Sequence, residues 1–308
     1  MQGTGEIGQL REGRTGRLLL ALILVTAAVL RFYRFTEIPF TYDELSALFR
    51  TRYDTFGELI RHGVMVDGHP AGVQVFLYYW VRWFGETPWV VKLPFAVMGW
   101  ASVYLMYRLA RMWFGMAAGL LAAAVMAVAQ YGVMYSQIAR PYGSGLFFSL
   151  WMLLFWSRMV RSRRITLRDA AGYVSGAVLL IYDHHFGALF AAVTLLTGLI
   201  PAPAALRRRW LALAAALVLL YLPHLPVFFR QLAMKGVGEW LAPPRASFLP
   251  DYLAYLFNFS PFFLVLMALL FFSPFLFLRG RLRHRRMILI NGIWFVVVLT
   301  TGFLYFAA

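Results

Sequence analysis

Long apolar runs alternate with short basic loops along most of the chain. An apolar run of about 20 residues is long enough to cross a hydrocarbon core of about 30 Å as a helix. We expect about nine such spans. They lie near residues 17–35, 89–107, 116–133, 144–160, 170–182, 186–200, 210–228, 260–278 and 287–306. The pattern therefore predicts an all-α fold, a polytopic transmembrane helical bundle.

Residues 70–84 form an apolar, aromatic run that we do not count as a span. The run is shorter than the usual 17–25 residues and contains Arg82. Counting it as a span would also move every later arginine cluster to the opposite side of the membrane. We therefore expect a helix that lies along the outer face. This helix belongs to a long first outer loop, residues 36–88.

The first outer loop carries its own helix signals. Thr41-x-x-Glu44 and Thr55-x-x-Glu58 both match the capping box that begins a helix. Residues 67–70, Asp-Gly-His-Pro, are typical of a turn. We therefore expect two or three amphipathic helices that lie on the membrane surface.

The basic residues indicate how the spans are oriented. Of the 29 basic residues, 18 fall in the predicted cytoplasmic segments, namely residues 11–17, 108–111, 158–168, 207–209 and 279–286. Lysine and arginine concentrate in cytoplasmic loops because of the positive-inside rule. The net charge is +16, and we expect the basic loops to bind anionic membrane lipids rather than nucleic acid. Only 14% of residues are charged, against roughly a quarter in a soluble protein, which excludes a soluble domain.

The acidic residues are distributed in the opposite way. Of 13 acidic residues, only Glu6, Glu12 and Asp169 fall in predicted cytoplasmic segments. Carboxylates beside a bilayer are costly to desolvate, so a cluster of them suggests a functional site. The sequence thus predicts chemistry at the outer boundary of the membrane. The chain has no cysteine, which excludes disulfide and thiolate chemistry.

Asp43 and Glu44 are the candidate catalytic residues. They follow the first span directly, in the first turn of a predicted helix. A local interpretation is sufficient for Glu44, which completes the capping box, and the helix dipole favours a carboxylate at Asp43. The functional interpretation makes Asp43 a general base or a metal ligand.

Further candidate binding residues lie in two other predicted outer segments. Asp67 and His69 either form a turn with a solvated histidine or bind a phosphate, a hydroxyl or a metal. Arg140 and Tyr142 lie in the aromatic segment 135–142. Arginine binds phosphate with two parallel hydrogen bonds, although pairing with an outer carboxylate would also explain Arg140.

His184 and Arg245 complete the set of candidates. His184 follows Asp183 between two predicted spans, where it binds substrate or, with Asp43 and His69, a divalent metal. Adjacent histidines often point apart, so the metal interpretation stays open. Arg245 lies in the outer loop of residues 230–258, where it is either solvated or holds a phosphate group.

An ordered set of short motifs resembles the GT-C-type membrane glycosyltransferases. More narrowly, it resembles the bacterial branch related to dolichyl-phosphate-mannose protein mannosyltransferases and to the aminoarabinose–lipid A transferase. The resemblance covers about residues 17–200 and rests on Tyr42-Asp-Glu44, Asp67-Gly-His-Pro70, Val91-Lys-Leu-Pro94, Tyr107-Arg-Leu-Ala-Arg111 and Ser136-Gln-Ile-Ala-Arg-Pro-Tyr142.

The resemblance implies an enzyme of the bacterial cell envelope. It would transfer a sugar from a polyprenyl-phosphate donor to a lipid, glycan or protein acceptor, with inversion, on the periplasmic face of the inner membrane. Asp43 would be the catalytic base, Arg140 would bind the donor phosphate, and His69 matches the family's His-Pro element. Residues 1–308 would form a single transmembrane domain that lacks the family's usual C-terminal part.

Two other functions are compatible with this sequence. One is a transporter or flippase for lipid-linked sugars, and the other is a truncated, non-catalytic relative. Transporters place ionisable residues near the membrane midplane, whereas the predicted spans here are nearly free of them. We therefore expect the glycosyltransferase.

Overall fold

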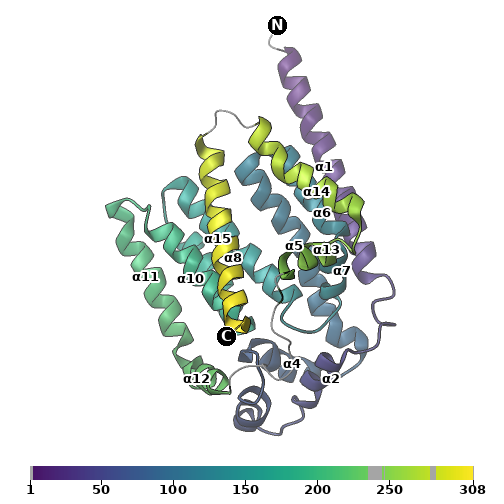
Figure 1. Cartoon of the computed structure of the whole chain (residues 1–308), viewed down its shortest axis with the longest axis vertical. Coiled ribbons are helices and arrows are strands. Elements are labelled where there is room, and N and C mark those ends of the chain that lie inside the picture. The colour runs from purple at the N-terminus through teal and green to yellow at the C-terminus, as the bar shows by residue number, and fades with distance from the viewer. Residues whose placement is uncertain (1–2, 235–244, 246, 278–281, 308) are drawn as a thin grey trace.

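A computed structural model of the chain describes residues 3–234, 245, 247–277 and 282–307. Every regular element in this part of the chain is a helix. The helices, labelled in Figure 1 where there is room, are α1 Gly3–Phe32, α2 Tyr42–Phe49, α3 Phe56–Glu58, η1 Leu59–Val64, α4 Ala71–Phe84, α5 Pro88–Phe114, α6 Met116–Val128, α7 Gln130–Ser136, α8 Gly143–Ser162, α9 Leu167–Asp183, α10 His185–Leu199, α11 Ala204–Tyr221, η2 Leu222–His224, α12 Leu225–Ala233, α13 Phe248–Leu256, α14 Pro261–Phe277 and α15 Leu282–Ala307. The predicted loop 230–258 and the last basic cluster, 279–286, fall partly outside the described residues.

Five stretches of helix are long and apolar enough to cross a membrane. They are Gly13–Phe32, Pro88–Phe114, Gly143–Ser162, Ala204–Ala233 and Arg286–Leu304. Two sharply bent helix pairs raise the number to as many as seven if each pair is one span. The all-α, polytopic bundle is confirmed, whereas the predicted number of nine spans is not. One of the predicted spans that is not among these candidates is α10, because its 15 residues reach only about 22 Å at 1.5 Å per residue.

The predicted third span, residues 116–133, is broken rather than straight. Helices α6 and α7 meet at an angle of 61°, because Ala129 between them has extended backbone with ψ of 120°. A break of this kind leaves carbonyl groups without helical partners. Arg31, buried in α1, supplies two of these partners by donating to Met126 O and Ala127 O, each at 3.0 Å.

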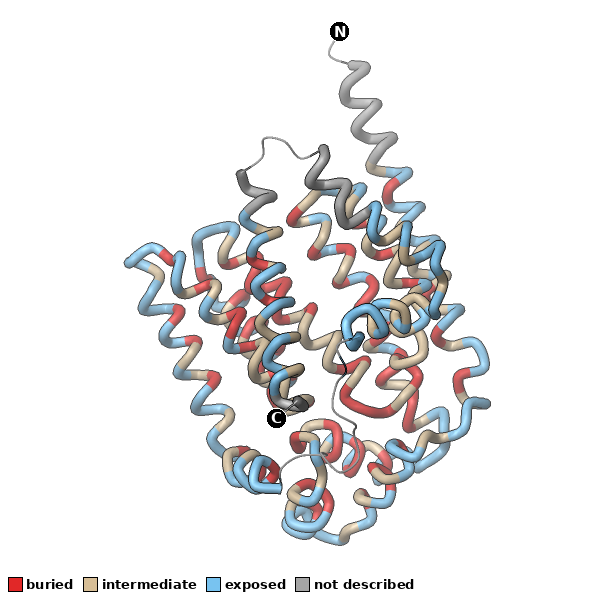
Figure 2. Tube along the Cα trace, in the orientation of Figure 1, coloured by how far each residue is buried: buried red, intermediate tan, exposed pale blue. Residues whose placement is uncertain are grey.

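The core of the bundle lies where α5, α8, α9, α10 and α11 pack together, and α15 adds Trp294 to it. Figure 2 shows the buried residues concentrated at this centre. Trp156 and Trp210 are almost fully buried there, and the indole of Trp156 donates to Thr194 O at 2.8 Å. Burying a tryptophan this deeply is favourable because its N–H group finds an acceptor.

The first outer loop is structured, as predicted. Helices α2 and α4 lie at one end of the bundle, away from the N-terminus (Figure 1). Both capping boxes are present, at Thr41–Glu44 and at Thr55–Glu58. Helix α4 covers the apolar run of residues 70–84 and is not among the candidate spans. Leu77 and Tyr78 of α4 are buried against the rest of the loop and the bundle.

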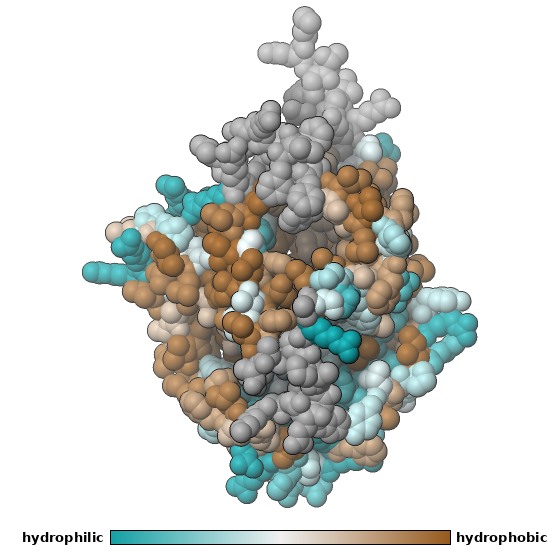
Figure 3. Space-filling model, in the orientation of Figure 1, coloured by the Kyte–Doolittle hydropathy of each residue, from teal (hydrophilic) through white to brown (hydrophobic). Residues whose placement is uncertain are grey.

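Apolar side chains cover much of the visible side of the bundle, as a bilayer would require (Figure 3). On α1, Leu18 and Leu22 are more than 60% exposed, and so are Val218 and Leu219 on α11. Such an extended apolar surface is costly in water and favourable in lipid. The chain is therefore an integral membrane protein.

Candidate functional site

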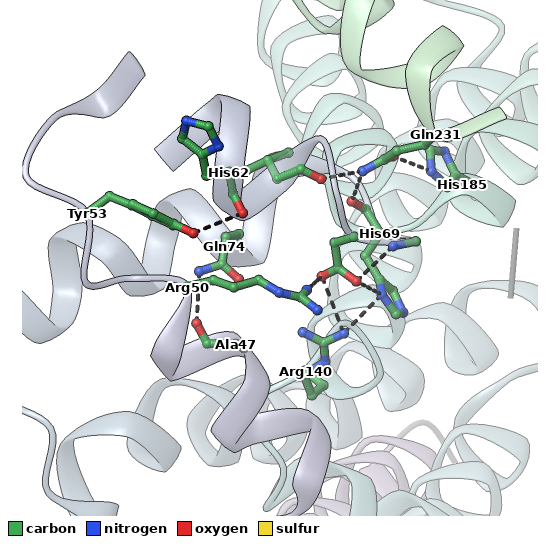
Figure 4. Close-up of polar contacts among 12 residues, drawn as sticks. Ala47, Arg50, Tyr53, His62, His69, Gln74, Arg140, His185 and Gln231 are labelled. Atoms are coloured by element: carbon green, nitrogen blue, oxygen red, sulfur yellow. Dashed lines mark hydrogen bonds and ion pairs between the residues drawn. The ribbon is translucent and has the colours of Figure 1, made fainter. Parts of the chain in front are cut away.

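At the end of the bundle that holds α2 and α4, three polar side chains converge on the carboxylate of Asp67. Asp67 and His69 lie in the turn before α4, Arg50 ends α2, and Arg140 lies in the loop before α8. Nη1 of Arg50 is 2.5 Å from Oδ2 of Asp67. Nη2 of Arg140 is 2.9 Å from Nδ1 of His69 and 3.8 Å from the same Asp67 oxygen. Figure 4 shows Arg50, His69 and Arg140 pointing toward one another.

The charges in this cluster do not cancel. Burial alone would raise the pKa of Asp67, but the adjacent His69 and the charges of Arg140 and Arg50 outweigh it and lower that pKa. Asp67 thus carries one negative charge between two guanidinium groups. The Arg140 side chain is only 6% exposed, and its Nε has no hydrogen-bond partner among the described residues. A buried arginine that shares its only carboxylate with a second arginine keeps excess positive charge, which favours the binding of an anion.

Asp43 reaches this cluster through Tyr142. Asp43 is exposed in the first turn of α2. Burial raises the pKa of the Tyr142 phenol, and the charge of Asp43 and its hydrogen bond with that hydroxyl raise it further. Arg140 and Asp67 also act electrostatically on Tyr142. The exposed carboxylate and the buried guanidinium therefore both act on Tyr142.

Glu44 is held on both of its oxygens by backbone N–H groups. Oε2 accepts from Thr41 N at 2.8 Å, which is the predicted capping contact. Oε1 accepts from Ala139 N at 2.9 Å, across 95 residues of sequence. Glu44 is 1% exposed. It therefore ties the N-terminus of α2, with Asp43, to the residue that precedes Arg140.

His184 lies against His69, with the ring centroids 5.6 Å apart. Its Nδ1 accepts from Phe186 N at 3.2 Å, so that nitrogen carries no proton. Burial first, and then the nearby His69, His185 and Arg140, lower the pKa of His184 to about 4. His184 is therefore neutral at neutral pH and adds no charge to the cluster.

The low pKa of His184 predicts a loss of stability in acid. The unfolded histidine takes up a proton near pH 6.5 and the folded one only near pH 4, so the folded state binds fewer protons between these values. Stability is fully present above pH 6.5 and falls as the pH drops toward 4. We expect a loss of about 1–2 kcal/mol between pH 7 and pH 5. Thermal unfolding in lipid nanodiscs should show it, and His184→Asn should flatten that part of the profile.

Gln231 and His224, which the sequence did not indicate, support the turn from the opposite side, together with His185. Nε2 of Gln231 in α12 donates to Val64 O at 2.8 Å and to His69 O at 2.7 Å, and its Oε1 accepts from Nε2 of His185 at 2.8 Å. Nε2 of His224 accepts from Ala71 N at 3.0 Å. His224 thus caps α4, whose N-cap residue makes no side-chain hydrogen bond. These contacts fix the backbone on both sides of Asp67.

Replacing Gln231 with leucine is therefore expected to destabilise the protein by about 1–3 kcal/mol, because two buried carbonyl groups lose their donor. The turn would loosen, so ligand affinity at the cluster should fall as well. Thermal unfolding and phosphate-ester binding in nanodiscs measure the two effects. Asn291→Leu is the matched control, since that amide donates to Met287 O within its own helix. Equal effects of the two substitutions would contradict the prediction.

Asp183 and Ser144 form a second buried pair near the cluster. Ser144 Oγ donates to Asp183 Oδ1 at 2.7 Å, and Oδ2 has no partner among the described residues. Burial raises the pKa of Asp183 to about 7, although the Ser144 bond and Arg140 counteract it. The sequence placed Asp183 on the outer side but gave no reason to pair it with Ser144.

The remaining predictions concern Arg245 and a metal. Arg245 borders a separate cavity together with Tyr252 and Tyr255 and does not join the Arg140 cluster. Asp43, His69 and His184 were the candidate metal ligands. In the described part of the chain, no group of three or more histidine, aspartate or glutamate side chains is arranged to hold a metal ion.

Comparison with known proteins adds one finding. The sequence model of a family described as dolichyl-phosphate-mannose-protein mannosyltransferase matches residues 68–226, which is 159 of the 308 residues. The match includes His69, Arg140, Tyr142 and His184 and begins just after Asp67. None of the curated proteins compared with this sequence matches it.

Proposed function

We infer the function of this chain from the family to which it belongs, the dolichyl-phosphate-mannose-protein mannosyltransferases. This family implies a membrane glycosyltransferase with a polyprenyl-phosphate sugar donor. We propose that the chain, as a single domain, transfers the sugar to an acceptor on the outer face of the membrane. In a bacterium this would be the periplasmic face of the inner membrane.

One observation carries this proposal: a buried, half-compensated guanidinium lies next to an exposed carboxylate, with Tyr142 between them. A donor phosphate at Arg140 would meet two arginines that share one aspartate. Guanidinium groups bind phosphate oxygens through parallel, charge-assisted hydrogen bonds. The charge that develops on the leaving phosphate would be stabilised there, which is usually the largest contribution to catalysis.

Asp43 acts as the general base in the proposed reaction. The acceptor's hydroxyl or amine attacks the anomeric carbon and forms a new bond to it. The bond between that carbon and the phosphate oxygen breaks, and its electron pair leaves with the lipid phosphate. The proton of the acceptor passes to the Asp43 carboxylate. Attack opposite the leaving group inverts the anomeric configuration.

The other site residues orient these groups. Glu44, with both oxygens on backbone N–H groups, positions Asp43 relative to Arg140. Tyr142 aims the base through its hydroxyl. Asp67 and His69 hold the Arg140 guanidinium in place, and the neutral His184 packs behind His69.

The buried cations of the spans support an enzyme over a transporter. Arg31 donates to backbone carbonyl groups of α1 and α6. Lys92 Nζ donates to Ile38 O at 2.8 Å. Both cations thus stabilise backbone breaks rather than line a path at the membrane midplane, which is where transporters bind their cargo.

The test is sugar transfer by purified protein in lipid nanodiscs. Radiolabelled polyprenyl-phosphate sugars would be supplied with an extract of cell-envelope lipids and glycans as acceptor. We expect labelled acceptor and free polyprenyl phosphate in equal amounts. Donor translocation in proteoliposomes without any transfer would instead identify a flippase, and binding without either activity would identify a non-catalytic relative.

A further inference from the structure

An open cavity of about 400 Å³ lies outside the Arg50–Asp67–Arg140 cluster, and the proposed reaction does not use it. It is lined by the aromatic residues Phe248, Tyr252, Tyr255 and Phe259 and by the charged residues Arg245 and Asp251. The volume falls within the range of small-ligand pockets, about 300–1,000 Å³. The wall aromatics come from α13 and the residues that follow it, and this segment folds back at 100° to α14.

A row of tyrosines links this cavity to Asp43. The hydroxyl of Tyr255 is 3.4 Å from that of Tyr135 in α7. The Tyr135 ring packs edge-on against Tyr142, with centroids 4.7 Å apart. Tyr142 in turn interacts electrostatically with Asp43. The cavity is therefore connected to the carboxylate end of the site, and it shares no described residue with the Arg50–Asp67–Arg140 cluster.

We propose that this cavity binds a saccharide ring of the acceptor, a role that rests on the transferase function proposed above. A pyranose has apolar C–H faces that pack on aromatic rings and hydroxyls that need hydrogen-bond partners. The wall supplies the rings. Arg245, Asp251 and the two tyrosine hydroxyls supply donors and acceptors.

The polar lining residues favour a sugar over the hydrocarbon chain of the donor. The side chains of Arg245, Asp251 and Tyr255 are exposed and can hydrogen-bond with the hydroxyls of a sugar ring. A polyprenyl chain forms no hydrogen bonds with them. The donor sugar is bonded to the phosphate at Arg140, and the cavity shares no described residue with the Arg140 cluster, so we assign the cavity to a saccharide of the acceptor. The enzyme would accordingly select glycan or glycolipid acceptors over unglycosylated protein.

The experiment measures binding rather than turnover. Saturation-transfer NMR would be recorded on the protein in deuterated nanodiscs with neutral trisaccharides of glucose, mannose, galactose and N-acetylglucosamine. We expect at least one to receive saturation at its ring C–H protons. Tyr255→Leu should weaken that binding about tenfold, since an aromatic contact is lost. Tyr255→Phe keeps the ring and should retain most of it, while Asp251→Asn should weaken it.

Two controls separate this proposal from the proposed function. Tyr33→Leu, at a tyrosine that directly follows α1 and is 69% exposed, should leave saccharide binding unchanged. Arg140→Gln should weaken binding of polyprenyl phosphate but leave binding of the trisaccharide unchanged. The proposal is overturned if wild-type protein binds none of the sugars, or if Tyr255→Leu and Tyr33→Leu act alike. Saturation of isoprene protons that depends on Tyr255 would assign the cavity to the donor chain instead.

Discussion

Replacing Asp43 with asparagine is expected to lower sugar transfer by about 10²–10⁴-fold while donor binding persists. Asparagine keeps the size of the side chain but cannot accept the acceptor's proton. The Tyr142 hydroxyl can still donate to the amide oxygen, and Glu44 still holds the start of α2, so the site should keep its shape. Initial rates with saturating donor, beside equilibrium binding of a polyprenyl phosphate, measure the two effects separately.

Asp54→Asn is the matched control for this prediction. Asp54 is also an exposed aspartate of the first outer loop, but among the described residues its contacts are those of its backbone carbonyl, which accepts from Tyr78 and Arg82. Transfer by this variant should stay within about twofold of wild type, as for most surface substitutions. If Asp43→Asn also stayed within that range, Asp43 would not be the base.

Replacing Arg140 with glutamine is expected to lower transfer by about 10²–10³-fold and to weaken donor binding as well. The phosphate would lose its buried cation, and Asp67 would keep only Arg50 as a charged partner. The pKa of Asp67 should therefore rise toward its ordinary value. The rate with saturating donor and the affinity for polyprenyl phosphate report on the two losses.

Arg140→Lys tests whether the shape of the cation matters. A lysine restores the charge but not the planar pair of donors, so we expect it to recover little activity. Arg61→Gln, at an exposed arginine of η1, should be nearly neutral. Full recovery of activity by the lysine variant would show that Arg140 acts through its charge alone. A normal rate in the glutamine variant would show that Arg140 has no role in the reaction.

The sequence predicted most of the fold where the signal was local. Both capping boxes were confirmed because each is a contact between residues three apart. Helix α4 was correctly not counted as a span, because its apolar run is short and contains Arg82. The number of spans was not confirmed, because hydropathy reports neither a bend such as that at Ala129 nor the short length of α10.

The candidate site was predicted unevenly for the same reason. Asp67, His69 and Arg140 lie together in the structure, and Tyr142 joins them to Asp43. Their catalytic roles stay predictions. Arg245 lies elsewhere because its loop leads to α13 rather than to the turn. The hydrogen bond from Gln231 to His69 O joins residues that are 162 positions apart, and no pattern within a sequence window reveals such a pair.

That long separation has a consequence for the synthesis of the protein. The turn with Asp67 leaves the ribosome early, but the His224 and Gln231 side chains that hold it are made about 160 residues later. At roughly 5–20 residues per second, the nascent chain would wait on the order of 10–30 s for them. The anion site would therefore form only after most of the helices have entered the bilayer, so a half-made chain could not capture lipid-linked sugar during its own insertion.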